Sequence, residues 1–148
     1  MPAIDVVSDA NVVLKWFHSK GEEEVEPARA LLDAHKERTV VLSVLDLTKY
    51  EVGNALMRGR SGASADQTAI VIEALLEICP FIRPSPEEMK AATQLAECHK
   101  LTLYDAVYAA VAQGRSAELV TLDRALLEAK LGVRPSELVA AMASAGGK

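Results

Sequence analysis

Aromatic residues are scarce in this sequence, whose 148 residues contain two Phe, one Trp and three Tyr. The core of such a chain must be aliphatic and rich in alanine, which suits helices lying on a sheet. Basic residues are also in the minority: 16 Lys and Arg stand against 21 Asp and Glu, and the formal net charge is −5. An acidic protein is a poor candidate for binding nucleic acid through a generally basic surface, so such binding would need local basic residues or bound cations.

Cysteine and long apolar runs are also limited. Cys79 and Cys98 have neither metal-binding nor redox spacing, so we expect reduced thiols in a cytosolic protein. The first residues, MPAIDVV, lack a basic region followed by a long apolar run, and we therefore expect no signal peptide. No stretch is long enough and free enough of charge to cross a bilayer, so we expect a cytoplasmic protein without a membrane partner.

Short apolar runs rich in β-branched residues alternate with helical patterns. Strands are expected at residues 4–7, 40–42, 81–83 and 119–121, with a further short strand at 133–134. Helices are expected at residues 10–17, 28–36, 43 to about 58, 64–78, 85–99, 101–114, 125–130 and 136–142. This alternation predicts an α/β, three-layer fold, with a short parallel sheet flanked by helices on both faces. We expect one domain over residues 1–148, with a frayed tail at 143–148.

Three capping patterns set the expected helix starts. Ser85 is followed by a proline and then by a Glu three residues on, which is the strongest such signal in the chain. Ser64 with Gln67 repeats the pattern. Ser43 with Asp46 is interpreted in the same way, and the charged residues 18–26 and the segment 59–62 are expected to be loops.

Four acidic residues stand where this fold places chemistry. Asp9 and Asp123 follow expected strands, and in open parallel sheets sites form beyond the carboxyl ends of the strands. Asp105 lies in the first turn of an expected helix, whose N-terminus should lie at that same edge. Glu51 is expected in the middle of a helix, on a face that is mostly uncharged. Either this helix face is assigned wrongly, or the Glu has a functional role.

Four carboxylates brought close together would repel one another, and some would stay protonated without cations. Mg²⁺ or Mn²⁺ is the natural partner for oxygen ligands, and one or two such ions can generate hydroxide from water and offset charge on a phosphodiester. The sequence contains no GxSxG motif, no P-loop and no glycine-rich dinucleotide fingerprint, and its histidines, His18, His35 and His99, have no ligand spacing. Metal-assisted phosphodiester hydrolysis is the chemistry that remains.

Each acid also has a purely structural interpretation. Asp9 and Asp123 could cap the helices that follow them, Asp105 could complement a helix dipole, and Glu51 could be solvated. Asn11 and Thr121 could hold Asp9 and Asp123 through hydrogen bonds, or could be local turn and strand residues. Singly, these interpretations are the better ones in most cases. Jointly, three acids at one sheet edge and a fourth on an inward face favour one site.

Four segments around these acids resemble the PIN domain family, and in particular the compact VapC-type toxins of prokaryotic toxin–antitoxin pairs. They are VVSDANVVLKWF, YEVGNAL, LTLYDAVYAAVA and LVTLDRAL, in the order the family has them, over residues 6–126. Each segment alone is a weak signal, whereas the ordered set is specific. The resemblance covers nearly the whole chain.

The resemblance implies a Mg²⁺- or Mn²⁺-dependent endoribonuclease with four catalytic and metal-binding acids, Asp9, Glu51, Asp105 and Asp123. Asn11 stands where the family often has Ser or Thr and would orient Asp9 or a metal-bound water, and Thr121 falls on the family's Thr before the last acid. The resemblance also implies an RNA substrate, a homodimer and silencing by a VapB-type antitoxin whose tail enters the acidic groove.

Two further interpretations stay open at this stage. The same fold could process RNA without an antitoxin, or could be a catalytically silent binding module, although all four acids are present. Five basic residues near the motifs are candidates for contacting phosphate, or equally for solvated surface charge: Lys15, Lys49, Arg58, Arg60 and Arg124. The apolar residues of the 64–78 helix could form a dimer patch together with the Glu51 helix, or belong to the core.

Overall fold

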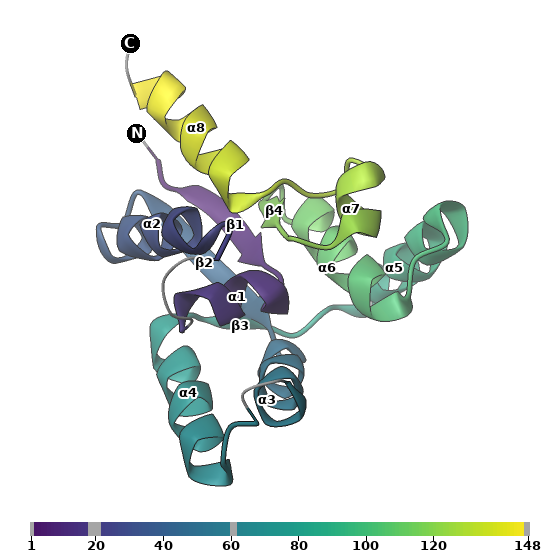
Figure 1. Cartoon of the computed structure of the whole chain (residues 1–148). Helices are drawn as coiled ribbons and strands as arrows, with labels where there is room; N and C mark the ends of the chain where they lie inside the picture. The colour runs from purple at the N-terminus through teal and green to yellow at the C-terminus, as the bar shows by residue number, and fades with distance from the viewer. Residues whose placement is uncertain (1, 18–21, 60–61, 147–148) are drawn as a thin grey trace.

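The computed structural model describes residues 2–17, 22–59 and 62–146. Its sheet runs in the order β3-β2-β1-β4 with all neighbouring strands parallel: β1 (Ile4–Ser8), β2 (Val40–Leu45), β3 (Phe81–Ile82) and β4 (Glu118–Val120) (Figure 1). The helices among the described residues are α1 (Ala10–Trp16), α2 (Val25–Lys36), α3 (Thr48–Arg58), α4 (Ala65–Ile78), α5 (Pro86–His99), α6 (Leu103–Gly114), α7 (Arg124–Glu128) and α8 (Pro135–Gly146). The predicted α/β, three-layer architecture is confirmed.

The central strand β1 is buried on both faces, and its successive residues belong to different cores. Val6 packs into a cluster that includes residues of α1, α2, α3 and α8, whereas Val7 packs into a cluster formed mainly by α6. Each of these two valines is 1% exposed. Because side chains alternate across a strand, this division makes the sheet the middle of three layers.

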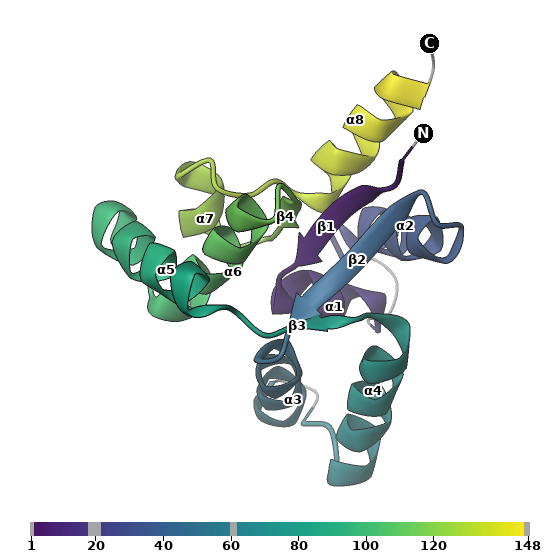
Figure 2. The same ribbon diagram turned by 180° about the vertical axis from the view of Figure 1, so that it is seen from behind.

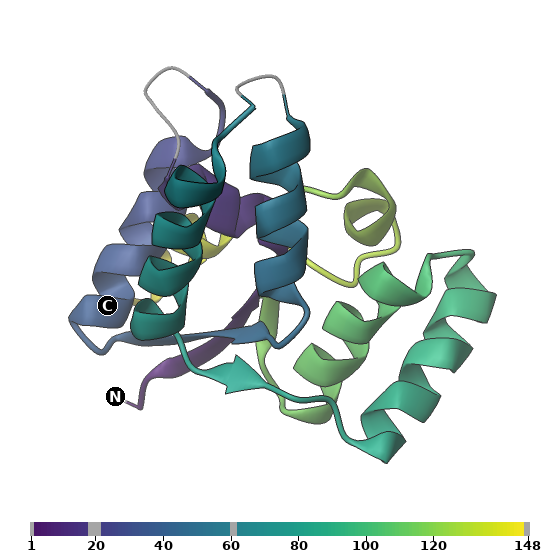
Figure 3. The ribbon, with the colours of Figure 1, turned by 90° about the horizontal axis from the view of Figure 1, so that it is seen from below.

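The two helical layers lie on opposite sides of the sheet. Helices α2, α3 and α4 lie on one side, and the antiparallel pair α5–α6 lies on the other (Figure 3). The connection from β3 to α5 runs between α3 and the α5–α6 pair (Figure 2). Alanine makes the second layer thin, because α6 buries Ala106, Ala109, Ala110 and Ala112 and can therefore approach the sheet closely.

The predicted capping box at Ser43 and Asp46 is wrong. Ser43 lies inside β2, which is three residues longer than the expected strand, and α3 begins only at Thr48. The extra length pairs β2 with β3, since Val44 and Leu45 face the two residues of that strand. Backbone pairing with a neighbouring strand therefore outweighed a local capping signal.

The other predicted element boundaries differ less from the structure. Helix α2 begins at Val25, so the expected loop at 18–26 is too long by two residues, and its residues 18–21 lie outside the described part. In the loop expected at 59–62, residues 60 and 61 also lie outside the described part of the chain. The strand expected at 133–134 is a single bridge between Val120 and Val133. Helix α8 extends to Gly146, four residues past its expected end, and fraying of 143–148 stays a prediction.

The remaining two capping boxes are confirmed. Ser64 with Gln67 opens α4, and Ser85 with Glu88 opens α5, each with both reciprocal hydrogen bonds. Cys79 and Cys98 are free thiols, as expected. Among the described residues, none of the helices has the length and apolar character that a membrane span needs.

Candidate active site

All four predicted acids lie at the N-termini of helices. Asp9 is the N-cap of α1 and Asp123 is the N-cap of α7, while Asp105 and Glu51 lie in the first turns of α6 and α3. The expectation that Glu51 lies in the middle of a helix is wrong, because α3 starts later than predicted. Helix N-termini carry partial positive charge, so these four positions favour negative groups.

Asp9 is the most deeply placed of the four, with an exposed fraction of 4%. Its Oδ1 accepts a hydrogen bond from the Ala10 N–H at 2.8 Å, and its Oδ2 accepts one from Thr121 Oγ1 at 2.7 Å. The pKa of Asp9 is raised to about 7, chiefly by burial and also by the nearby charges of Glu51 and Asp105, against the lowering effect of the two hydrogen bonds. A buried carboxylate with such a pKa needs a compensating positive charge to be fully ionised at neutral pH.

Thr121 and Asn11 tie the first acid to the last. The Thr121 hydroxyl donates to Asp9 and accepts from the Asp123 N–H at 3.0 Å. Asn11 Oδ1 accepts from the Leu122 N–H at 3.1 Å, and its Nδ2 donates to Asp9 Oδ2 at 3.5 Å. The backbone that carries Asp123 is thereby held against the residue that carries Asp9, although the two are far apart in sequence.

Two residues that support Glu51 were missed by the sequence analysis. Tyr108 donates a hydrogen bond to Glu51 Oε1 at 2.6 Å, and Thr48 Oγ1 lies 2.7 Å from the same tyrosine hydroxyl. Tyr108 is fully buried in the structure. A sequence signal did exist, since Tyr108 stands three residues after Asp105 and therefore lies on the same helix face.

The carboxyl groups influence one another electrostatically. Burial raises the pKa of Glu51 first and the charge of Asp105 raises it further, while the Tyr108 hydrogen bond lowers it. Burial also raises the pKa of Asp105, with a further contribution from the charge of Asp123. These couplings connect all four acids in one cluster, which is the arrangement that the sequence analysis predicted. Mutual repulsion of this kind favours the binding of a cation among the acids.

The donor set fits a hard divalent cation by its chemistry, because every candidate ligand is a carboxylate oxygen. Among the described residues, no three His, Cys, Asp or Glu side chains already form a cage for an ion. Mg²⁺ does not require such a cage, since proteins usually hold it through one or two carboxylates and leave several waters in place. The four acids are therefore suited to a hydrated ion.

The basic candidates differ in their availability. Lys15 forms an ion pair with Glu22 at 2.8 Å, so its charge is already balanced. The Lys49 ammonium lies 5.3 Å from the centre of the Tyr50 ring. Arg124 has a side chain that is 90% exposed, with Glu128 3.9 Å away. Arg58 is also exposed, and Arg60 lies outside the described residues.

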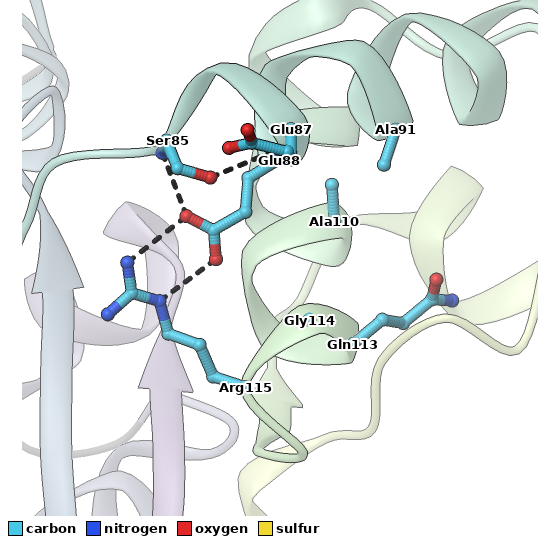
Figure 4. Close-up of a pocket in the computed structure, with 8 residues that line it drawn as sticks. All are labelled: Ser85, Glu87, Glu88, Ala91, Ala110, Gln113, Gly114 and Arg115. Atoms are coloured by element: carbon cyan, nitrogen blue, oxygen red, sulfur yellow. Dashed lines mark hydrogen bonds and ion pairs between the residues drawn. The ribbon is translucent and has the colours of Figure 1, made fainter.

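A cavity of about 510 Å³ lies between α5 and α6, and none of the four acids lines it (Figure 4). Its two paired charged residues are Glu88 and Arg115, whose Nε lies 2.9 Å from Glu88 Oε2 and whose Nη2 lies 3.1 Å from Oε1. The guanidinium of Arg115 lowers the pKa of Glu88. This pair satisfies its own charges, so the acidic cluster remains the candidate active site.

The chain is similar to known proteins of one family. The model of the PIN domain matches residues 6–131. The chain is 36% identical over 127 residues to "Ribonuclease VapC3" of Pyrobaculum aerophilum, covering 83% of this chain and 92% of that protein. It is 34% identical over 93 residues to "Exonuclease VapC9" of the same organism, covering 63% of this chain and 68% of that protein.

Solved structures share the fold. The crystal structure of PAE2754 from Pyrobaculum aerophilum superimposes with a TM-score of 0.69 at 27% identity, over 95% of this chain and 90% of that one. A toxin–antitoxin complex from Klebsiella pneumoniae gives a TM-score of 0.64 at 21% identity, over 88% of this chain and 97% of that one. With its family match over most of its length and its well-covered relatives, the chain belongs to the PIN domain family.

Proposed function

We propose that this protein is a Mg²⁺- or Mn²⁺-dependent endoribonuclease and the toxin of a VapBC-type toxin–antitoxin pair in the cytoplasm. The observation that carries the proposal is the cluster of four coupled carboxyl groups at one edge of the sheet. Membership of the PIN domain family and similarity to a relative named as a ribonuclease support the reaction class. The clustered, mutually repelling acids, of which Asp9 is buried, give the chain a reason to bind a cation at neutral pH.

In this proposal Asp9, Glu51, Asp105 and Asp123 hold the metal. When bound, one or two ions would activate water and offset negative charge on the phosphodiester. Thr121 fixes the direction of one Asp9 oxygen through its 2.7 Å hydrogen bond. Tyr108 does the same for Glu51 at 2.6 Å. Such neighbours pre-orient ligand oxygens, so less order has to be created when the cation binds.

The antitoxin proposal rests on a structural relative, and the homodimer proposal rests on an exposed face of this chain. The Klebsiella pneumoniae structure is titled as a toxin–antitoxin complex, which supports a VapB-type antitoxin as partner. A homodimer is proposed through the α3–α4 face, where Ile70 is 66% exposed while its helix neighbour Leu75 is buried. Sedimentation of the isolated protein tests this, with a dimer expected in the parent and a monomer after Ile70→Lys. A parent protein that is purely monomeric contradicts the homodimer.

Cleavage of RNA in the presence of Mg²⁺ or Mn²⁺ tests the reaction. We expect Asp9→Asn and Asp105→Asn to lose most of the activity, whereas Asp33→Asn, which neutralises an exposed acid on α2, keeps it. One relative is named as an exonuclease, so the assay must distinguish endonuclease from exonuclease action. The RNA used in the assay is therefore circular, because a circle has no end to digest. Cleavage of the circle shows endonuclease action; equal rates in all variants contradict the proposed site.

Two alternatives are separated by the same assay and by gene context. A silent binding module binds RNA but cleaves none with either metal. A nuclease of RNA processing cleaves RNA, yet its gene has no neighbouring gene for a small DNA-binding antitoxin. The presence of all four acids and their coupling favours the active enzyme over the silent module.

A further inference from the structure

Two exposed tyrosines each stand directly before a site acid. Tyr50 precedes Glu51 at the start of α3, and Tyr104 precedes Asp105 at the start of α6. Both tyrosines are 66% exposed. Aromatic residues are scarce in this chain, and two of its three tyrosines present open rings next in sequence to site acids, which makes them candidates for contacting a ligand.

A groove connects the two tyrosines. Tyr104 lines a cavity of about 480 Å³, and Tyr50 lines a neighbouring cavity of about 240 Å³. The two cavities share three lining residues, Asp46, Leu47 and Arg83, and therefore form one continuous surface, which we call the tyrosine groove. Arg83 and Pro84, which line the larger cavity, belong to the connection from β3 to α5. This connection passes between α3 and α6 (Figure 2).

Positive charge accompanies the rings. Arg83 lies between the two cavities with a side chain that is 90% exposed, and its Nε is 4.0 Å from Asp46 Oδ2, a contact too long to hold it firmly. The Lys49 ammonium lies 5.3 Å from the ring centres of both Tyr50 and Phe81. Exposed aromatic faces with interspersed cations are the combination that proteins use for single-stranded nucleic acid.

We propose that the tyrosine groove binds single-stranded RNA next to the scissile phosphate, with bases stacked on Tyr50 and Tyr104 and phosphates near Lys49 and Arg83. This inference rests on the proposed ribonuclease function. RNA is the occupant because each tyrosine directly precedes a site acid in the first turn of a helix. The lining also carries two cations, Lys49 and Arg83, against the single acid Asp46, and this excess of positive charge complements a polyanion. A double-stranded RNA cannot present unstacked bases to the rings, so the groove selects single strands.

Binding is measured separately from cleavage. The probe is a fluorescein-labelled single-stranded oligouridylate about 12 nucleotides long, long enough to span several stacking positions. Anisotropy titrations in Mg²⁺ use the Asp9→Asn background, so that substrate is not consumed. We expect Tyr50→Ala and Tyr104→Ala each to weaken binding about tenfold. Tyr50→Phe and Tyr104→Phe keep the rings and should bind like the background protein.

A strand of equal charge without bases is the second probe. The background protein should prefer the oligouridylate over an abasic strand of the same length, and the two alanine variants should lose this preference. Val41→Ala, a change at an exposed apolar residue outside the groove, should alter neither affinity. Because both tyrosines are largely exposed, melting temperatures should stay close to that of the background protein.

Three results would overturn the proposal: unchanged RNA affinity after both alanine substitutions, equal binding of the abasic strand, or equal losses with Phe and Ala. A groove that serves a protein partner gives the first of these results. Failure of the proposed function is a different observation, because the parent protein would then cleave no RNA while these binding constants would still be measurable.

Discussion

The Tyr108 hydroxyl gives its single proton to Glu51, so Thr48 must be the donor in the 2.7 Å contact between Thr48 Oγ1 and the same hydroxyl. Thr48 in turn accepts a hydrogen bond from the Leu45 N–H at 3.0 Å. A chain of three hydrogen bonds therefore runs from the last residue of β2 to a site carboxylate. The sheet backbone positions Glu51 through two buried side chains.

Substitution of Tyr108 by Phe tests this chain. The hydrogen bond from Tyr108 lowers the pKa of Glu51, so its loss should raise that pKa and leave Glu51 protonated more often. We expect about tenfold weaker affinity for the metal, seen as a higher Mg²⁺ concentration for half-maximal RNA cleavage. Unfolding free energy should fall by about 1 kcal/mol because Thr48 loses its partner. An unchanged Mg²⁺ requirement would contradict the positioning role.

The pKa of Asp9 predicts how stability depends on pH without metal. Folding raises this pKa from 3.8 to about 7, so the folded protein binds the proton more tightly than the unfolded chain. Stability is therefore greatest at low pH on this account and falls as pH rises toward neutrality, by about 3 kcal/mol between about pH 5 and pH 8. Denaturant titrations in EDTA measure the loss. Asp9→Asn should flatten the profile, and a parent that gains stability over this range would contradict the assignment.

Divalent cation should reverse the same loss. A cation that binds the folded acids and not the unfolded chain stabilises by mass action, by about 2.7 kcal/mol at a hundred times its dissociation constant. We therefore expect Mg²⁺ or Mn²⁺ to raise the melting temperature near neutral pH in the parent and in Asp33→Asn. In Asp9→Asn and Asp105→Asn the increase should be small. Equal increases in all four proteins would place the ion elsewhere.

Local patterns were sufficient for much of the fold and of the site. The capping boxes at Ser64 and Ser85 fixed two helix starts, and strand ends placed Asp9 and Asp123, because each of these signals is a contact between near neighbours in sequence. Ser43 misled because its signal is equally local, whereas β2 is extended by pairing with a distant strand.

Long-range contacts explain what remained hidden. Tyr108 and Glu51 are 57 residues apart, and the burial that makes their hydrogen bond important appears only when α6 packs on the sheet. The position of Glu51 within its helix was predicted wrongly for the same reason. The helix was expected to begin at residue 43, but that residue lies in β2, and α3 begins at Thr48. Its role as an inward-facing acid was nevertheless predictable, because its neighbours in sequence are mostly uncharged.

Thr121 should be required for its hydroxyl. Thr121→Val removes the donor to Asp9 and the acceptor for the Asp123 N–H while keeping the shape of the side chain. We expect a loss of about 1–3 kcal/mol in unfolding free energy and of about tenfold or more in RNA cleavage. Thr121→Ser keeps both hydrogen bonds and should retain most of the activity. Thr93→Val, on the exposed face of α5, is the matched control.

The backbone at Gly132 leaves no room for a side chain beside Thr121. A Cβ at this position would lie 2.7 Å from Thr121 Cγ2 and 3.2 Å from the Leu119 carbonyl oxygen. Gly132→Ala should therefore cost about 1–3 kcal/mol and reduce cleavage, because it displaces the residue that holds Asp9. Gly114→Ala, whose Cβ would come no closer than 3.4 Å to any neighbour, should cost little.

Combining the two substitutions separates a displaced Thr121 from a general loss of packing. Thr121→Ser removes the methyl group that Gly132→Ala would strike and keeps the hydroxyl that bonds to Asp9. The double variant should therefore be more stable than the sum of the single effects, by about 0.5 kcal/mol or more, and should recover cleavage. The recovery is partial because the contact with Leu119 remains. If the two effects on stability are strictly additive, Gly132→Ala destabilises the fold without acting through Thr121.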